Sequence, residues 1–177
     1  MNSQARLASV GVYARGNSGR RKVRAICLYL HLLYIMGRII GIDYGTKRIG
    51  IAVTDPLQVI ASPLTTVATA SFDDFIDEYI NKEKVEAFVI GYPKQLNNSP
   101  SKSVVHINPF IKKLKKKYPE ISIHLADERF TSVMAMRSMI DGGVKKIDRQ
   151  DKSMTDRISA ALILQSYLDS KSVIKKV

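Results

Sequence analysis

Three acidic residues border apolar segments of the sequence, where a buried carboxylate would be costly without a partner. Asp43 ends the apolar run 38–42, Glu128 follows the apolar run 121–125, and Asp156 lies near the start of the last apolar segment. Burying an unpaired carboxylate costs on the order of several kcal/mol, and neighbouring carboxylates repel one another. Clustered carboxylate oxygens suit Mg²⁺ or Mn²⁺, and two such ions can activate water and stabilise the leaving oxygen in phosphodiester cleavage. The three acids therefore predict a divalent-metal site if folding brings them together.

The first two acids also have simpler interpretations. Asp43 precedes a turn centred on Gly45, so its carboxylate can accept a local turn hydrogen bond. Glu128 can pair with Arg129 or be a surface charge that follows a strand. In a mixed sheet whose first and fourth strands are neighbours, however, Asp43 and Glu128 can approach one another. Both interpretations stay open at this point.

Asp156 has two interpretations of its own. The residues Ser153-Met154-Thr155-Asp156 fit a helix-capping box, in which an acid needs no catalytic purpose. At about 100° per residue, however, Asp156 shares a helix face with Ala160, Ile163 and Tyr167. An acid at the head of an apolar stripe should point toward the protein, and the small Ala160 would let this helix approach a sheet closely.

Basic residues near these acids are candidate contacts for a phosphate backbone. Two of them follow Asp43 in the hairpin turn, and others lie in the polar loop 144–152 that leads to Asp156. Exposed charges in a turn or loop are the alternative, and the lysine-rich helix end 112–117 is more typical of a solvated face. The residues expected to bind substrate are Lys47, Arg48, Lys94, Arg129, Lys145, Lys146 and Arg149.

The periodicity of the chain predicts an α/β domain that can gather these residues. Two apolar segments, 38–43 and 47–54, are joined by a glycine turn and predict a hairpin, and Pro63 predicts that a third strand lies at a sheet edge. An antiparallel meander followed by βα crossovers gives a mixed five-stranded sheet with helices on both faces, which is the ribonuclease-H-like (RNase H-like) layout. The later elements expected are a helix opened by a capping box at 71–74, a strand at 85–90, a helix from about 104 that ends in the lysine-rich segment 112–117, a strand at 121–125, a helix at 131–140 and a last helix from 153 to about 169.

Composition sets limits on the partners. The formal net charge of the 177 residues is +12, and residues 1–35 hold six basic and no acidic residues, which leaves 36–177 at +6. A moderately basic domain suits a polyanionic partner. The single cysteine, Cys27, excludes an intrachain disulfide and a zinc site built of several cysteines, as expected for a reduced cytoplasmic protein.

The first 35 residues imitate a secretory signal, because a basic cluster at 20–24 precedes an apolar run. No small-residue cleavage site follows this run, His31 interrupts it, and it is too short to span a membrane. We therefore expect residues 1–35 to be a non-structural extension upstream of a natural start at Met36, and residues 36–177 to form the RNase H-like domain. We expect no membrane contact.

Four motifs, taken in order, resemble the YqgF family of bacterial RNase H-like proteins. They are GIDYGTKRIG at 41–50, GYPK at 91–94, DERFT at 127–131 and DRISAALIL at 156–164, and the resemblance covers nearly all of residues 36–170. Members are related to Holliday-junction resolvases and are regarded as nucleases that mature the small-subunit ribosomal RNA precursor. The loop 95–102, commonly glycine-rich with an arginine in the family, departs from the pattern in this chain.

The resemblance implies that Asp43, Glu128 and Asp156 form the acidic site, with Mg²⁺ or Mn²⁺ as the cofactor. It implies a cytoplasmic nuclease that processes the 5′ end of pre-16S rRNA, with structured RNA and ribosomal particles as partners. Two alternatives remain, a Holliday-junction-type DNA nuclease and a nucleic-acid-binding or regulatory protein without catalysis. An ATPase of the sugar-kinase or actin class, which also opens on an Asp-x-Gly-Thr turn, needs two lobes, and 142 residues from Met36 suffice for one.

Overall fold

The computed structural model describes residues 37–93, 102–127, 131–143, 145 and 151–174. The chain divides into two units, residues 1–35 and residues 36–177, and every described residue belongs to the second unit. The expectation of a non-structural extension therefore falls on residues outside this part of the chain and stays a prediction.

A single mixed sheet of five strands forms the centre of the second unit, in the order β3-β2-β1-β4-β5. The first three strands form an antiparallel meander, whereas β4 and β5 run parallel to β1. The predicted sheet and its neighbouring first and fourth strands are therefore confirmed. The strands are β1 (Arg38–Tyr44), β2 (Arg48–Thr54), β3 (Ala61–Ala68), β4 (Val85–Tyr92) and β5 (Ser122–Asp127).

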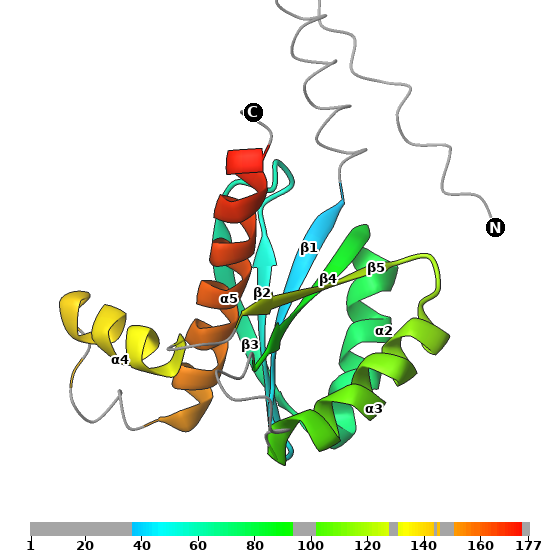
Figure 1. Cartoon of the computed structure of the whole chain (residues 1–177), viewed down its shortest axis with the longest axis horizontal. Helices are drawn as coiled ribbons and strands as arrows, with labels where there is room; N and C mark the ends of the chain where they lie inside the picture. The colour runs from blue at the N-terminus through cyan, green and yellow to red at the C-terminus, as the bar shows by residue number, and fades with distance from the viewer. Residues whose placement is uncertain (1–36, 94–101, 128–130, 144, 146–150, 175–177) are drawn as a thin grey trace, which may run out of the picture. The chain divides into compact units, whose positions relative to one another are not determined.

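Helices cover both faces of this sheet (Figure 1). One face packs against α2 and α3, the other face packs against the long helix α5, and α4 lies beside α5. The predicted α/β architecture with helices on both faces is therefore confirmed. The helices are a short 3-10 turn η1 (Thr69–Ser71), α2 (Phe72–Lys82), α3 (Lys102–Lys117), α4 (Thr131–Asp141) and α5 (Lys152–Ile174).

The alternation of side chains along β1 builds two separate cores. Ile40 and Ile42 are fully buried against α2 and α3, whereas Ile39 faces α5. This follows from the period of two in a strand, which sends successive side chains to opposite faces. The same alternation decides which face Asp43 and Tyr44 occupy at the end of the strand. Asp43 lies on the α5 face, and Tyr44 packs with the other core.

The structure contradicts the predicted capping box at Ser71. The Ser71 side chain makes no cap hydrogen bond, so the predicted capping box is wrong. The reason is local, because Ser71 ends the preceding turn η1 and has a ψ of 5° instead of the extended conformation of a capping residue.

The edge position of β3 is confirmed, with Ser62, Pro63 and Leu64 exposed. Among the described residues, no helix is long and apolar enough to cross a membrane.

Candidate active site

The side chain of Asp43 and the first turns of α5 lie on the same face of the sheet. Asp43 pairs directly with Gly50 of β2, and the side chains of directly paired residues in antiparallel strands point to the same face. A Cβ atom on Gly50 would overlap the backbone carbonyl of Asp156. The backbone of Asp156 therefore lies directly over the cross-strand partner of Asp43, so these two predicted acids belong to neighbouring segments on the same face of the sheet.

The close approach of α5 to the sheet depends on small residues farther along as well. A Cβ atom on Gly41 would lie 2.7 Å from the Cβ of Leu164 and 2.9 Å from the carbonyl oxygen of Ala160. Ala160 itself is fully buried. The prediction that a small residue at 160 lets this helix approach the sheet is confirmed. The glycines on the sheet side were missed by the sequence reasoning, although a glycine inside a strand is a known sign of close backbone approach.

The start of α5 excludes the capping-box interpretation of Asp156. The helix begins at Lys152, and the side chain of Asp151 accepts a hydrogen bond of 2.8 Å from the Ser153 amide. Asp151 is therefore the capping residue. Asp156 lies more than one turn inside the helix, beyond the position of the acid in a capping box, so that interpretation is wrong. The Thr66 hydroxyl donates a 2.7 Å bond to the Ser153 carbonyl and ties this end of α5 to β3.

Arg48 and Asp156 form an ion pair at the site. The Arg48 Nε donates to Asp156 Oδ2 at 3.0 Å, across 108 positions of sequence. The Arg48 side chain is 42% exposed and that of Asp156 is 28% exposed. Arg48 lies two residues before Gly50 on β2, so it points to the α5 face like Asp43. The structure therefore places a basic residue, predicted to bind substrate, among the acids.

The third predicted acid, Glu128, lies outside the described residues. The strand before it, β5, pairs with β4, and β4 lies between β5 and β1. Glu128 follows the fifth strand and not the fourth, so the pairing of β1 with β4 does not test the expected approach of Asp43 and Glu128, which stays a prediction. The described ends of β1 and β5 are two strand spacings apart, about 10 Å.

The donor set in this region fits a hard divalent cation. Asp43 and Asp156 supply carboxylate oxygens, which Mg²⁺ and Mn²⁺ prefer. Ser159, one turn after Asp156, is 1% exposed, and its hydroxyl has no hydrogen-bond partner within the described part of the chain. In that same part, no three His, Cys, Asp or Glu side chains gather as a metal site. The three-acid site thus depends on Glu128 and stays a prediction.

The other predicted substrate contacts divide into two groups. Lys47 and Lys145 are exposed, so both are accessible to a phosphate backbone. The described lysines of the α3 end at 112, 115 and 116 are exposed, as predicted for a solvated face, whereas Lys113 and Lys117 pair with acids of α2. The predicted contacts that lie outside the described residues are Lys94, Arg129, Lys146 and Arg149.

Comparison with known proteins assigns the chain to a family. Residues 37–170 match the model of the RuvX family, described as a Holliday junction resolvase. The chain belongs to the RuvX family. The family predicted from the four motifs is thereby confirmed, and so is the prediction of a nuclease-class enzyme.

RuvX relatives match over their whole length. The chain is 55% identical over 139 residues to a protein of Phocaeicola vulgatus named "Putative pre-16S rRNA nuclease", which covers 78% of this chain and all of the relative. A protein of the same name from Bacteroides thetaiotaomicron is 54% identical over 136 residues, which covers 77% of this chain and 99% of the relative. Among solved structures, Thermus thermophilus RuvC in complex with a Holliday junction substrate aligns at 15% identity and a TM-score of 0.47, over 77% of this chain and 96% of that one.

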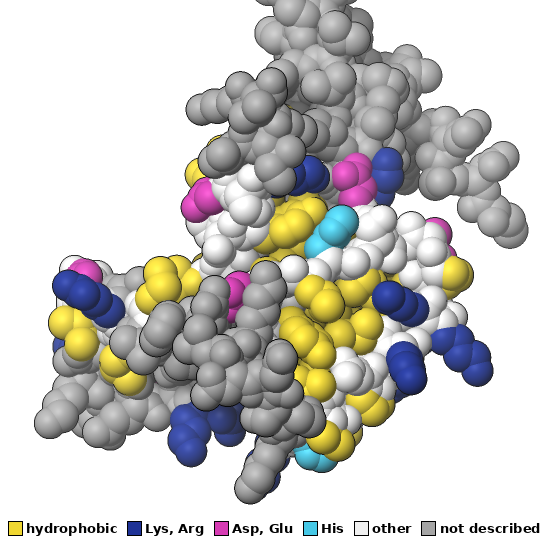
Figure 2. Space-filling view, in the orientation of Figure 1, with side chains coloured by type: hydrophobic (Ala, Val, Ile, Leu, Met, Phe, Trp, Pro, Cys, Tyr) yellow, Lys and Arg dark blue, Asp and Glu magenta, His cyan; other side chains and the backbone are white. Residues whose placement is uncertain are grey.

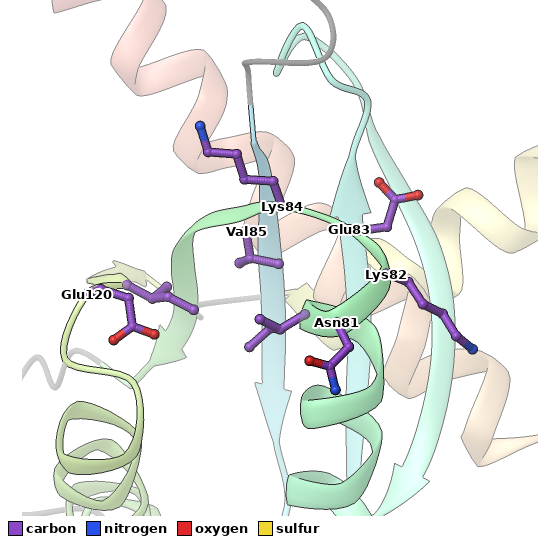
Figure 3. Close-up of a pocket in the computed structure, with 8 residues that line it drawn as sticks. Asn81, Lys82, Glu83, Lys84, Val85 and Glu120 are labelled. Carbon is purple, nitrogen blue, oxygen red and sulfur yellow. The ribbon is translucent and has the colours of Figure 1, made fainter. Parts of the chain in front are cut away.

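A hollow at the other end of the sheet lacks the features of an active site. It is lined by residues of the α2–β4 connection and by Glu120, with a volume of about 370 Å³. In Figure 3, the charged ends of Lys82, Glu83 and Lys84 point in different directions instead of converging. It adjoins the first residue of β4, whereas Asp43 lies near the last residue of the parallel strand β1. Asp43 and the Asp156 backbone that lies over its strand partner are therefore at the opposite end of the sheet.

Proposed function

We propose that the chain is a divalent-metal-dependent nuclease that uses Asp43, Glu128 and Asp156 to hydrolyse phosphodiester bonds in structured RNA. Membership of the RuvX family supports the reaction class. The names of the relatives support precursor 16S rRNA as the substrate. The proposal extends this to cleavage at the 5′ end of that precursor during ribosome biogenesis. Ribosomal particles in the cytoplasm are then its natural partners.

The observation that carries this proposal is the placement of Asp43 and Asp156. They are 113 positions apart in the sequence, yet the Asp156 backbone lies over Gly50, the direct partner of Asp43. A structural explanation of Asp156 as a helix cap fails, because Asp151 takes that role. An acid that the helix does not need, placed beside a second acid at the end of a strand, supports a site that holds a cation.

Glu128 is proposed to complete the set. Ala126, two residues earlier on β5, packs on the α5 side of the sheet. The period of two in a strand would continue this direction to position 128. Bound Mg²⁺ or Mn²⁺ would supply activation of water and neutralisation of the leaving oxygen. Asp43, Asp156 and Glu128 would hold the ions, and Arg48, Lys47 and Lys145 would attract and position the phosphate backbone.

The family description favours a second candidate substrate, a four-way DNA junction. The DNA junction contains the same phosphodiester group as the RNA precursor, so the site residues do not distinguish between these two substrates. Both substrates would be tested with the same preparations. Purified full-length chain would be incubated with a precursor 16S rRNA fragment and with a four-way DNA junction, each with Mn²⁺ and each with a chelator.

The decisive variant is Asp43→Asn, which keeps the size of the side chain and removes its charge. We expect cleavage to fall at least 100-fold while binding of nucleic acid and the unfolding midpoint change little. Asp74→Asn is the matched control, because Asp74 is an exposed acid on α2. Cleavage by Asp43→Asn at the rate of the unaltered chain would refute the catalytic assignment. Binding without cleavage by the unaltered chain would favour the non-catalytic alternative.

A further inference from the structure

A cleft of about 340 Å³ adjoins the candidate active site on the opposite face of the sheet. It lies between the end of β1, the start of α2 and the helix α3. Its volume is at the lower end of the range of small-molecule sites, about 300–1,000 Å³. Its lining is distinct from the acids and bases assigned to the active site. The lining residues are Tyr44, Thr69, Phe72, Asp73, Val105, His106, Pro109, Phe110 and Lys113.

Three aromatic rings form the floor of this cleft. The Tyr44 and Phe110 rings have centroids 4.6 Å apart, and Phe72 meets Phe110 edge-on at 5.1 Å. Phe72 is 1% exposed and Phe110 is 9% exposed, so both are held by the core. Tyr44 is only partly buried and presents its ring nearer the surface. Phe110 therefore supports the Tyr44 ring from the core, and Tyr44 is the ring that a flat ligand can reach.

The rim of the cleft is polar and carries both signs of charge. The Thr69 hydroxyl donates a 2.8 Å hydrogen bond to the Gly45 carbonyl, which ties the rim to the turn after Asp43. Asp73 and Lys113 form an ion pair across the cleft from α2 to α3. Val105 is 64% exposed and His106 is exposed, so the α3 side of the mouth is open to solvent. Figure 2 shows hydrophobic side chains reaching the surface over β5 and α3, with basic side chains at the border.

The cleft and the acids are joined by a single peptide unit. Tyr44 follows Asp43 directly, the two Cα atoms are therefore about 3.8 Å apart, and the side chains point to opposite faces at the end of β1. A nucleic-acid strand whose phosphate meets Asp43 could pass around the turn at Gly45. The nucleotide next to that phosphate would then reach the cleft.

We propose that this cleft is a subsite for one unpaired nucleobase of the substrate strand, an inference that rests on the proposed nuclease function. The partly exposed Tyr44 ring offers a surface for stacking, and the rim offers both donors and acceptors for the edge of a base. The mixed charges of Asp73 and Lys113 do not suit a purely anionic ligand. The subsite selects substrates with an unstacked nucleotide beside the scissile bond, such as RNA ends, bulges and branch points.

Two titrations separate the base from the phosphates. The full-length chain, labelled with ¹⁵N and kept in chelator so that no cleavage occurs, would be titrated with a five-nucleotide RNA of adenosines. The second titration would use the same oligonucleotide with an abasic central nucleotide. We expect shifts of the Thr69, Val105 and His106 amide signals with the first probe, and at least threefold weaker binding with the second. Equal binding of both probes, or shifts that leave these three signals unmoved, would overturn the subsite.

Val105→Glu tests the same proposal by placing a negative charge at the mouth. We expect it to weaken binding of the five-nucleotide RNA at least fivefold. Val59→Glu is the matched control, because Val59 is 60% exposed, close to the 64% of Val105, and lies in the β2–β3 connection. Circular dichroism would verify that both variants fold. Equal weakening by both variants, or by neither, would refute the subsite.

The outcomes also separate this subsite from the proposed nuclease activity, because the titrations need no catalysis. Base-dependent binding at these signals without cleavage of either substrate would count against the nuclease and support the subsite. Cleavage with no loss of binding in Val105→Glu would support the nuclease and overturn the subsite.

Discussion

A side chain on Gly50 and the backbone of Asp156 cannot occupy the same space. A Cβ atom on Gly50 would overlap the Asp156 carbonyl group, although the two residues are 106 positions apart in the sequence. Gly50 is also the direct cross-strand partner of Asp43. The absence of a side chain at this one position therefore decides how closely α5 approaches the acid at the end of β1.

Gly50→Ala should accordingly disturb both stability and activity. The added methyl group must push α5 away from β2, and overpacking of this kind costs about 1–3 kcal/mol in the free energy of unfolding. Nuclease activity should fall by more than the loss of folded protein explains, because Asp156 moves relative to Asp43. Urea unfolding and cleavage assays measure the two effects.

Gly142→Ala, at an exposed position after α4, is the control for the glycine replacement and should change the free energy of unfolding by less than about 1 kcal/mol. If Gly50→Ala were as stable and as active as the unaltered chain, the close approach of α5 would not matter for the site.

Arg48→Gln should increase the affinity for Mn²⁺. In the ion pair, the guanidinium group competes with a metal ion for Asp156 Oδ2. Partly exposed pairs contribute about 0.2–1 kcal/mol, which corresponds to an increase of at most about fivefold. Isothermal titration of Mn²⁺ into the full-length chain measures this change without any substrate.

Lys47→Gln is the matched control for this prediction, because it removes an equal charge at the neighbouring exposed position. Its effect on Mn²⁺ affinity should be smaller than that of Arg48→Gln. Weaker Mn²⁺ binding in Arg48→Gln would show that the arginine supports the acids instead of competing for them.

The double variant Lys145→Ala with Lys146→Ala should weaken nucleic-acid binding and flatten its dependence on salt. Each lost phosphate contact removes about 0.7–0.9 from the slope of log affinity against log salt. Fluorescence anisotropy at several salt concentrations measures this slope. Lys115→Ala with Lys116→Ala, an exposed lysine pair on α3, is the control and should leave the slope nearly unchanged. A slope equal to that of the unaltered chain would exclude the first pair as phosphate contacts.

Stability should fall in alkaline solution, partly through Tyr118. Burial raises the pKa of Tyr118 from 10.0 to about 12, and its hydroxyl donates a 2.7 Å hydrogen bond to Asp77. Because the folded state holds the proton more tightly than the unfolded state, this contribution to stability is complete below pH 10 and is lost between about pH 10 and pH 12.

Urea midpoints at pH 9 and pH 12 measure this loss, and Tyr118→Phe should show a smaller one. The variant should also be less stable at pH 7, by about 0.5–1.5 kcal/mol, because the hydrogen bond is absent. An equal alkaline loss in both proteins would assign the effect to other groups, such as Tyr79 and Tyr167, in which burial also raises the pKa.

Much of the fold follows from local pattern. The isoleucine runs, the glycine turn before Arg48 and the helical spacing of apolar residues are local signals, because strand and helix periods repeat every two and 3.6 residues. They were sufficient for the order of elements and for the edge position of β3. The capping box at Ser71 failed, because the sequence pattern does not reveal that a 3-10 turn occupies the place of the cap.

By itself, the sequence determined the strand that carries Asp43 near its end, the helix that carries Asp156 and the family to which both motifs belong. Tertiary structure alone decided that Arg48 pairs with Asp156 and that Gly50 admits the helix backbone beside Asp43. The physical reason is the sequence separation of the residues in contact. Periodicity and capping act over a few residues, whereas these contacts join segments about a hundred residues apart and exist only when a helix packs against a sheet.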